Sequence, residues 1–259
     1  MSVKLKVKDL EMVFDGKQTL NKVSFDVQDG EFLSILGPSG CGKTTILRIL
    51  IGLLKPTGGS ILKDGVDIVD APPADRGMGI VFQNYALFEN MTVLQNVEYA
   101  LKIRKENKSA EGKKKVRERA LTVIEQLGLT EHIDKMPTML SGGQQQRVAI
   151  ARTMVLNPDI ILFDEPMSAL DVETRLSLRA ELKRIQKEFG TTMIYITHDQ
   201  EEAFAMSDRI MVMREANIVQ LDTPENILDH PADEYVKTFV LRNLQIKIDS
   251  LLKCVRKTV

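Results

Sequence analysis

The N-terminal part of the chain alternates between apolar and polar residues with a period of two. The apolar positions are Val3, Leu5 and Val7, followed by Val23, Phe25 and Val27. This period is typical of half-buried strands, which are most often antiparallel. We therefore expect an antiparallel sheet at the start of the chain.

Three later segments are short and almost continuously apolar, namely Phe32–Leu36, Ile160–Phe163 and Met193–Ile196. Such runs suit strands that are covered on both faces, as in a parallel sheet. Each run is followed by a turn and a helical pattern. The alternation of strand and helix predicts an α/β core.

Residues 92–155 are expected to be mostly helical. Helical spacing is clearest in one set of apolar positions, Val116, Ala120, Val123, Ile124 and Leu127. Farther along, two short strands are predicted at Arg209–Met213 and Ile218–Leu221, around a tight turn at Glu215–Asn217.

The end of the chain has the pattern of an amphipathic helix. Its apolar face consists of Leu241, Leu244, Ile248, Leu251 and Val255. We expect this face to pack on the chain's own domain, and the surface of a partner protein is the alternative.

Composition narrows the class of protein. The chain has 259 residues, a formal net charge of −1 and two cysteines. This charge gives no global attraction to nucleic acid, and the cysteines predict no disulfide framework. No apolar run approaches the roughly 18–20 residues that cross a bilayer, and the N-terminus lacks a signal-peptide core. We expect a cytoplasmic protein, with any membrane spans supplied by other chains.

The segment 102–119 is locally basic, with nine Lys or Arg residues and three Asp or Glu residues. We interpret it as a solvated helix face and loop. A nucleic-acid patch is the alternative, but no aromatic residue interrupts the segment to stack on bases.

A phosphate-binding loop follows the first buried strand. Its residues are Gly37, Pro38, Ser39, Gly40, Cys41, Gly42, Lys43 and Thr44, with Thr45 opening the helical run Thr45–Leu54. The sequence fits G-x-x-x-x-G-K-[ST] between a strand and a helix, which is the context that this motif requires. Lys43 is expected to meet the β- and γ-phosphates, and Thr44 to bind Mg²⁺. A glycine-rich turn without a ligand is the alternative.

Two carboxylates end the second buried strand, in IILFDE at 160–165. In α/β proteins this edge of the sheet is where ligands bind. We expect Asp164 to hold Mg²⁺ and Glu165 to orient or deprotonate the attacking water. Without the phosphate loop, a helix cap would be the preferred interpretation.

Two more polar residues follow predicted core strands. His198 follows Met193–Ile196 and is predicted to lie on the edge that carries Lys43 and Glu165, within reach of a γ-phosphate. Gln83 follows the predicted strand Gly79–Phe82 and could reach Mg²⁺ or the attacking water. A capping or surface role is the alternative for each. His132 and His230 have no such placement, and we interpret both as structural.

A second glycine-rich stretch, LSGGQQQR at 140–147, completes a set of motifs that resembles the ATP-binding subunits of ABC transporters. GPSGCGKT resembles their Walker A loop, IILFDE the Walker B strand, and LSGGQQQR their own signature sequence. Gln83, Ser168–Asp171 and His198 resemble the Q-loop residue, the D-loop and the H-loop histidine. P-loop kinases and small GTPases do not carry the signature, which argues against them.

The resemblance implies a role for the second glycine stretch. In this family two subunits pack head to tail, so Ser141, Gly142 and Gly143 would touch the γ-phosphate of ATP bound to the partner. Gln144 and Asp171 are included among the expected nucleotide contacts. Phe14 in MVFDG would stack on adenine, and a core aromatic is the alternative.

The segments 72–101 and 222–240 resemble bacterial importers that handle polyamines, iron, sulfate, phosphonates and sugars. The resemblance implies ATP and Mg²⁺ as cofactors and a second nucleotide-binding subunit, expected to be another copy of this chain. It further implies two permease subunits and, indirectly, a solute-binding protein, so we expect a peripheral protein on the inner face of the cell membrane. We expect no C-terminal regulatory barrel. A soluble ABC ATPase acting on ribosomes or DNA is the alternative, as is a P-loop kinase or binding-only module.

The fold expected from this resemblance is α/β, with a mostly parallel P-loop NTPase core, an N-terminal antiparallel β subdomain and an inserted helical subdomain. The core is placed at 1–91 and 156–225, the helical signature subdomain at 92–155 and a helical tail at 226–259.

Overall fold

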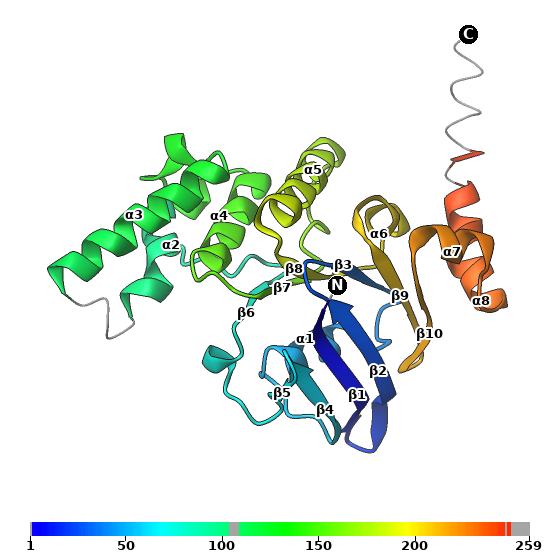
Figure 1. Ribbon diagram of the computed structural model, residues 1–259. Helices are drawn as coiled ribbons and strands as arrows, with labels where there is room; N and C mark the ends of the chain where they lie inside the picture. The colour runs from blue at the N-terminus through cyan, green and yellow to red at the C-terminus, as the bar shows by residue number, and fades with distance from the viewer. Residues whose placement is uncertain (1, 104–108, 247, 250–259) are drawn as a thin grey trace, which may run out of the picture. The chain divides into compact units, whose positions relative to one another are not determined.

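A computed structural model describes residues 2–103, 109–246, 248 and 249 (Figure 1). The chain clusters into two compact units. The first is formed by Met1–Arg76 together with Gln186–Val259, and the second by Gly77–Ile185. The predicted helical segment 92–155 therefore lies within the second unit, although its predicted boundaries stay a prediction.

The first unit begins with an antiparallel sheet in the order β2-β1-β4-β5. Its strands are β1 Val3–Phe14, β2 Lys17–Gln28, β4 Gly58–Lys63 and β5 Val66–Asp67. The sequence predicted this sheet from the period-two pattern, and the alternation is present, with Leu5 and Val7 buried. Val3 is 43% exposed, because the pairing of β1 with β2 shifts register between Val3 and Leu5.

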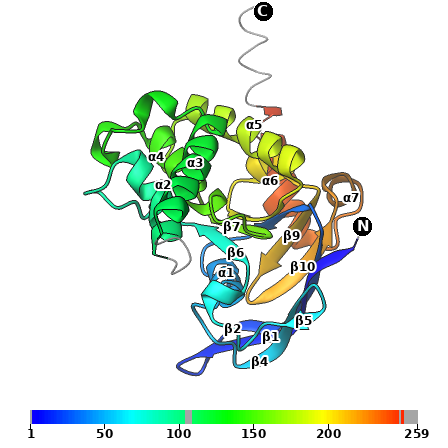
Figure 2. The same cartoon turned by 60° about the vertical axis from the view of Figure 1, so that its left-hand side comes forward.

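Four further strands of the first unit are paired in the order β10-β9-β3-β8. Figure 2 shows the neighbours β9 and β10 side by side. They are β3 Phe32–Leu36, β8 Thr192–Thr197, β9 Arg209–Arg214 and β10 Asn217–Asp222. β3 runs parallel to β8 and β9, and both β3 and β8 are buried along their whole length. The predicted tight turn joins β9 to β10, with Glu215 and Ala216 both in the left-handed region that such turns require.

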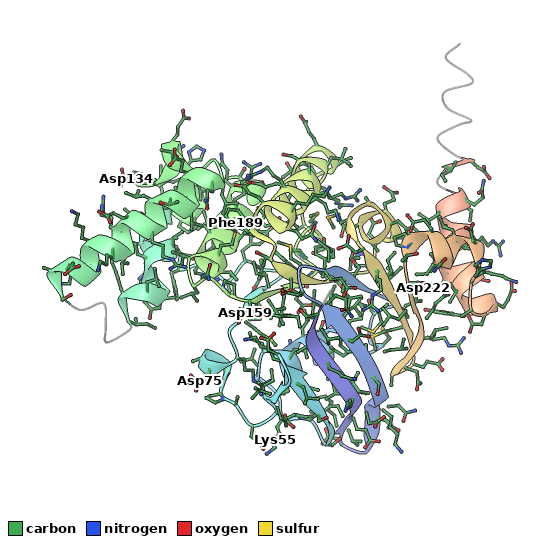
Figure 3. The ribbon with its side chains drawn as sticks, viewed as in Figure 1. Lys55, Asp75, Asp134, Asp159, Phe189 and Asp222 are labelled. Carbon is green, nitrogen blue, oxygen red and sulfur yellow. The ribbon has the colours of Figure 1, made fainter. Side chains whose placement is uncertain are left out.

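The first unit has short helices. They are α1 Lys43–Leu50, the 3₁₀ helix η1 Pro73–Asp75, α6 Gln200–Met206, α7 Pro224–Asp229 and α8 Glu234–Val236, which continues as the π-helix η5 Lys237–Arg242. Two polar residues start α7, since Thr223 caps it and Asp222, labelled in Figure 3, accepts from Asn226.

The helix after the phosphate loop differs from the predicted range Thr45–Leu54. It starts at Lys43 and ends at Leu50, because Gly52 takes a left-handed conformation (φ 87°). Arg76, which is 3% exposed, then covers the helix end by donating to the carbonyls of Ile49 (2.7 Å) and Leu50 (2.9 Å). Carbonyls at a helix C-terminus attract such a cation.

The described part of the tail confirms the predicted packing only in part. Leu241 and Leu244 pack against a buried cluster that includes Leu36 and Val240. Ile248, however, is 49% exposed, so the predicted apolar face does not stay in contact with its own domain. The π-helical turn shifts the register of the side chains that follow it. Leu251 and Val255 lie outside the described residues.

The second unit contains two parallel strands and most of the helices. They are β6 Met78–Val81, β7 Ile160–Asp164, α2 Val93–Lys102, α3 Ala110–Gln126, α4 Gly142–Met154, α5 Val172–Phe189 and the 3₁₀ helices η3 Thr130–His132 and η4 Pro137–Met139. The region 92–155 is thus mostly helical, as the sequence predicted, and α2, α3 and α4 pack on one another.

Helix α3 confirms the expectation of a solvated basic face for the described part of 102–119. Its charged residues are exposed, and two of its pairs, Lys115–Glu111 and Lys114–Glu118, follow the i,i+4 spacing. The predicted apolar positions face inward, with Val116 and Ala120 buried. Residues 104–108 lie outside the described residues.

The observed elements confirm the expected α/β fold class, with an antiparallel N-terminal sheet, parallel strands and an inserted helical region. Within residues 2–103, 109–246 and 248–249, no helix combines the length and apolar character needed to cross a membrane.

Candidate functional site

The loop 37–42 connects β3 to α1 in a conformation that depends on glycine. Gly40 and Gly42 have φ values of 81° and 108°. A Cβ atom on Gly42 would lie 2.7 Å from the carbonyl oxygen of Thr19 and 2.7 Å from Leu20. Gly42 is the N-cap of α1 and has no side chain to bond the helix start, whose backbone N–H groups and dipole attract an anion.

Lys43 lies at the start of α1 and points back into this loop. It is 5% exposed, and its Nζ donates to the carbonyls of Gly37 (2.8 Å) and Pro38 (2.9 Å). A buried ammonium group held by neutral carbonyls is stabilised further when an anion arrives. The loop, the uncapped helix and this lysine therefore fit a phosphate chain.

Other loop residues differ in exposure. Pro38, Ser39 and Gly40 are exposed, and Thr44 and Thr45 are half-buried. Cys41 is 4% exposed, and its burial raises the pKa of the thiol although Lys43 opposes this shift. The thiol is therefore a packing group in the loop.

His198 lies beside the loop in the first unit. Leu36 pairs with Thr197 in the parallel ladder, so Gly37 and His198 leave neighbouring strands at the same edge. The side chain of His198 is exposed. The sequence correctly predicted its position after a core strand.

A buried carboxylate that the sequence analysis missed holds the end of β8. Glu202 is 4% exposed and accepts from the hydroxyls of Tyr195 (2.7 Å) and Thr197 (2.8 Å). Thr197 in turn accepts from the Asp199 backbone N–H at 3.0 Å. This network fixes the backbone on both sides of His198. Glu202 is the last residue of THDQEE, but nothing in the sequence distinguished it from a solvent-exposed glutamate.

In the second unit, β6 and β7 bring three predicted residues to one edge. Val81 pairs with Phe163, so Gln83, which lies just beyond β6, is near Asp164 at the end of β7 and Glu165 just after it. Asp164 and Glu165 are half-buried, and Glu165 has a left-handed backbone (φ 46°). Such strain in a non-glycine residue is typical of functional positions.

Ser168 connects two of these residues. Gln83 Nε2 donates to Ser168 Oγ at 3.1 Å, and Ser168 Oγ donates to the carbonyl of Glu165 at 3.1 Å. The predicted Q-loop residue Gln83 is therefore linked through Ser168, in the predicted D-loop, to the residue that follows the Walker B strand.

The signature residues form the start of α4. Ser141 is the N-cap, and a capping box joins it to Gln144. Ser141 and Gly142 are exposed, so this helix start faces outward from its unit. A Cβ on Gly143 would lie 2.5 Å from Thr174 Cγ2, which explains the need for glycine there.

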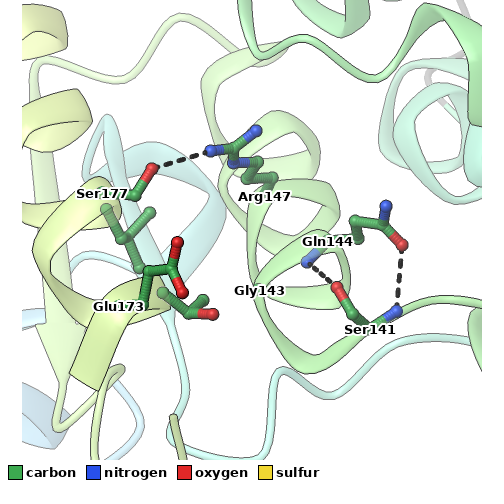
Figure 4. Close-up of a pocket in the computed structure, with 8 residues that line it drawn as sticks. Ser141, Gly143, Gln144, Arg147, Glu173 and Ser177 are labelled. Carbon is green, nitrogen blue, oxygen red and sulfur yellow. Dashed lines mark hydrogen bonds between the residues drawn. The ribbon is translucent and has the colours of Figure 1, made fainter. Parts of the chain in front are cut away.

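A pocket of about 270 Å³ lies beside this helix start (Figure 4). Its lining comes from α4 and α5: Ser141, Gly143, Gln144, Arg147, Glu173, Thr174, Ser177 and Leu178. Arg147 is held by Glu181 at 2.9 Å and by Ser177 at 3.4 Å. Polar groups on a concave surface suit a polar ligand.

Asp171 caps α5 next to this pocket. It accepts from the Thr174 backbone N–H (2.9 Å) and hydroxyl (2.7 Å), and these bonds lower the pKa of its carboxyl. Its carboxylate is thus engaged within the second unit, and its predicted nucleotide contact stays a prediction.

Phe14 lies at the end of β1 and is 41% exposed. The alternative that it is a core aromatic is therefore wrong. An exposed ring at a strand end remains available to stack on a base.

A second residue missed by the sequence analysis is Arg152, near the end of α4. Its guanidinium donates to the carbonyls of Ala86 (2.6 Å) and Tyr85 (2.9 Å) and lies 5.6 Å from the centre of the Phe88 ring. Burial lowers the pKa of Arg152. Tyr85 and Ala86 are consecutive left-handed residues, so this side chain stabilises an unfavourable turn just after Gln83.

The predicted Mg²⁺ ligands are a hydroxyl, an amide and a carboxylate, from Thr44, Gln83 and Asp164. This donor set suits Mg²⁺, which takes oxygen ligands and keeps several waters and substrate phosphates. Among the described residues, no group of three or more His, Cys, Asp or Glu forms a metal site on its own.

The sequence profile described as "ABC transporter" matches residues 20–168. This chain belongs to the ABC transporter family. The match covers the Walker A loop, the signature sequence and the Walker B strand in one segment, so the resemblance seen in the sequence is confirmed.

Relatives of this ABC domain carry the name "Spermidine/putrescine import ATP-binding protein PotA". One from Marinobacter nauticus is 45% identical over 236 residues, which is 91% of this chain and 62% of the relative. One from Bacillus cereus is 47% identical over 243 residues, which is 94% of this chain and 73% of the relative. The chain thus spans less than two thirds of the Marinobacter protein.

Solved structures agree with the observed fold. The ABC domain aligns with "Structure of cbiO1 from clostridium perfringens: Part of the ABC transporter complex cbiONQ" at a TM-score of 0.80 and 28% identity, covering 99% of this chain and 100% of that one. It also aligns with "Dimeric Structure of MJ0796, a Bacterial ABC Transporter Cassette" at a TM-score of 0.74 and 35% identity, covering 85% and 98%.

Proposed function

We propose that this ABC domain binds and hydrolyses ATP, with Mg²⁺ as cofactor, to power solute import through an ABC transporter. Family membership and the names of its relatives support this reading. The alternative of a soluble ABC ATPase acting on ribosomes or DNA has no support among these relatives.

The residues have distinct proposed roles. Lys43 and the N–H groups at the start of α1 bind the β- and γ-phosphates, and Phe14 stacks on adenine. Glu165 orients and deprotonates the attacking water, and His198 contacts the γ-phosphate. Thr44, Gln83 and Asp164 would hold Mg²⁺, which would supply positive charge to offset the charge that develops on the phosphates.

One observation supports a composite site most strongly: the exposed start of α4. Ser141 and Gly142 are exposed on the surface of the unit, beside a pocket that Arg147, Glu173 and Thr174 help to line. We infer that this helix start binds the γ-phosphate of ATP held by a second copy of the chain. Because ATP contacts both subunits, it favours the closed dimer, and hydrolysis releases it.

The partners follow from the same proposal. They are a second nucleotide-binding subunit, two transmembrane permease subunits and, acting through the permeases, a solute-binding protein. The chain itself would lie in the cytoplasm, bound to the permeases at the inner face of the membrane. The names of the relatives make polyamines the first solute class to test. This solute would be bound by the other subunits.

The test uses the Glu165→Gln variant, which should bind ATP, lose turnover and accumulate as a dimer. Light scattering with and without Mg-ATP measures the mass. Glu118→Gln, an exposed change on α3, is the matched control and should retain turnover. Adding Ser141→Arg to Glu165→Gln should abolish the dimer, because bulk and charge would face the partner's phosphate. Normal turnover in Glu165→Gln would remove Glu165 from the proposed role.

A further inference from the structure

A histidine outside the family motifs contacts the signature helix. The side chain of Gln144 makes two contacts: its Oε1 accepts from the Ser141 backbone N–H at 2.9 Å, and its Nε2 lies 2.9 Å from His132 Nε2. Ser141, Gln144 and His132 therefore form one chain of polar contacts. From the sequence alone, His132 was predicted to be structural.

The orientation of the Gln144 amide follows from hydrogen-bond chemistry. The backbone N–H of Ser141 can only donate, so the amide atom that faces it must be the carbonyl oxygen. The other end of the amide is then NH₂, which also only donates. His132 Nε2 must therefore accept, and the neutral ring must carry its proton on Nδ1.

The surroundings of His132 support a specific contact between its Nε2 and the Gln144 amide. The ring is half-buried, and within the described residues its buried Nδ1 makes no hydrogen bond. The Gln144 contact is consequently what selects the tautomer. A ring protonated on Nε2 would bring one donor against another.

The backbone around His132 is fixed from two sides. The N–H of His132 donates to Leu129, a residue with no exposed surface, at 2.9 Å. At the start of α2, Leu94 donates to the carbonyl of Ile133 and Val93 to that of Lys135, each at 3.0 Å. The imidazole thus projects from a rigid segment, which is what a positioning group needs.

The two halves of the capping box are unequal. The bond from the Gln144 backbone N–H to Ser141 Oγ is long, at 3.4 Å, whereas the bond from the Ser141 N–H to Gln144 Oε1 is 2.9 Å. The bond from the Ser141 backbone to the Gln144 side chain is therefore stronger than the bond from the Gln144 backbone to the Ser141 hydroxyl.

We propose that His132 is a positioning residue for the signature serine. Its Nε2 accepts from Gln144 and so fixes the amide that orients Ser141 toward the partner's γ-phosphate. This inference rests on the proposed function for the role of Ser141, whereas the His132–Gln144–Ser141 contacts themselves do not.

The first test measures the tautomer without nucleotide. A long-range ¹H–¹⁵N correlation spectrum distinguishes a protonated from an unprotonated ring nitrogen, and the chain has only three histidines to assign. We expect His132 to be unprotonated at Nε2. Gln144→Glu offers only acceptors, so it should reverse the contact and move the proton to Nε2. A His132 ring that carries its proton on Nε2 in the unmodified protein would overturn the proposal.

The second test measures ATP-dependent dimerisation in the Glu165→Gln background. His132→Leu removes the acceptor and should raise the ATP concentration for half-maximal dimer roughly five- to tenfold, the factor expected for one lost hydrogen bond. His132→Gln supplies a carbonyl acceptor and should restore most of the loss. His230→Leu, the same change at an exposed histidine, is the matched control and should have no effect.

The two tests separate this inference from the proposed function. Failure of Glu165→Gln itself to dimerise with ATP would count against the composite site, while the tautomer would still report on His132. If Glu165→Gln dimerises with ATP, two results would show that the positioning role is wrong. Adding His132→Leu could leave the ATP concentration for half-maximal dimer unchanged, or His132→Gln could require as much ATP as His132→Leu.

Discussion

The starts of α1 and α4 both carry glycine-rich phosphate motifs, but they are built in opposite ways. α1 begins at Lys43 after Gly42, which has no side chain with which to cap the helix. α4 begins at a capping box, in which the side chains of Ser141 and Gln144 each accept from the other residue's backbone N–H. The first helix start suits a phosphate bound by its own chain, whereas the second is a surface shaped by its own side chains that can be presented to another molecule.

The largest expected effect comes from adding a side chain at Gly42, the N-cap of α1. Gly42→Ala should lower ATP affinity on the order of a hundredfold, because the added Cβ meets Thr19 and Leu20 at 2.7 Å. Isothermal titration calorimetry measures the affinity. Gly65→Ala is the control, since Gly65 also has a positive φ (81°) but a Cβ there meets nothing within 4 Å. If Gly42→Ala and Gly65→Ala bound ATP with equal affinity, the proposed difference between the two helix starts would be wrong.

An intermediate effect is expected at Gly143. Although Gly→Ala within a helix normally stabilises by about 1 kcal/mol, the contact with Thr174 Cγ2 at 2.5 Å should reverse the sign. We expect Gly143→Ala to lower the free energy of unfolding by about 1–2 kcal/mol. Urea denaturation measures it. Adding Thr174→Ser removes the clashing methyl group and should recover the lost free energy of unfolding. If Gly143→Ala alone stabilised the protein, α4 and α5 would not need close contact at this point.

The smallest effect concerns the cap itself. Ser141→Ala should reduce the free energy of unfolding by about 0.5–1 kcal/mol. Thr92→Ala is a matched comparison, because Thr92 caps α2 with the same kind of capping box and a shorter bond of 3.2 Å against 3.4 Å. We expect Thr92→Ala to cost at least as much in the same urea series. A much larger loss for Ser141→Ala would show that its hydroxyl does more within the free subunit than cap a helix.

The sequence predicted those parts of the fold that depend on local pattern. The buried strands β3, β7 and β8 were predicted from continuous apolar runs, and α3 from its helical spacing, because burial on two faces or one leaves a clear periodicity. The motifs predicted that Lys43 begins a helix and that Ser141 lies at a helix start, as the structure shows, since phosphate binding at a helix start needs a fixed spacing of glycines. Their contacts with nucleotide stay a prediction.

Features that depend on contacts between distant residues were not predictable. The roles of Glu202, Arg152 and His132 arise from pairings with other segments, and a polar residue outside a motif gives no signal of its partner. The end of α1 was predicted too late because the apolar pattern continues past Gly52, where the backbone turns. The exposure of Ile248 was missed because a π-helical turn changes the spacing on which the prediction relied.

The link between Arg152 and residues 85–86 has a consequence for motion. Two adjacent backbone conformations, each unfavourable for a residue with a side chain, are bonded by a single guanidinium. Both bonds are lost together when the arginine moves away, so the carbonyls of Tyr85 and Ala86 are released in the same event. The amide hydrogens of Tyr85 and Ala86, which donate to Phe82 (3.0 Å) and Asn84 (2.6 Å), should then exchange with solvent as a pair, at a rate that rises with how often α4 releases that side chain.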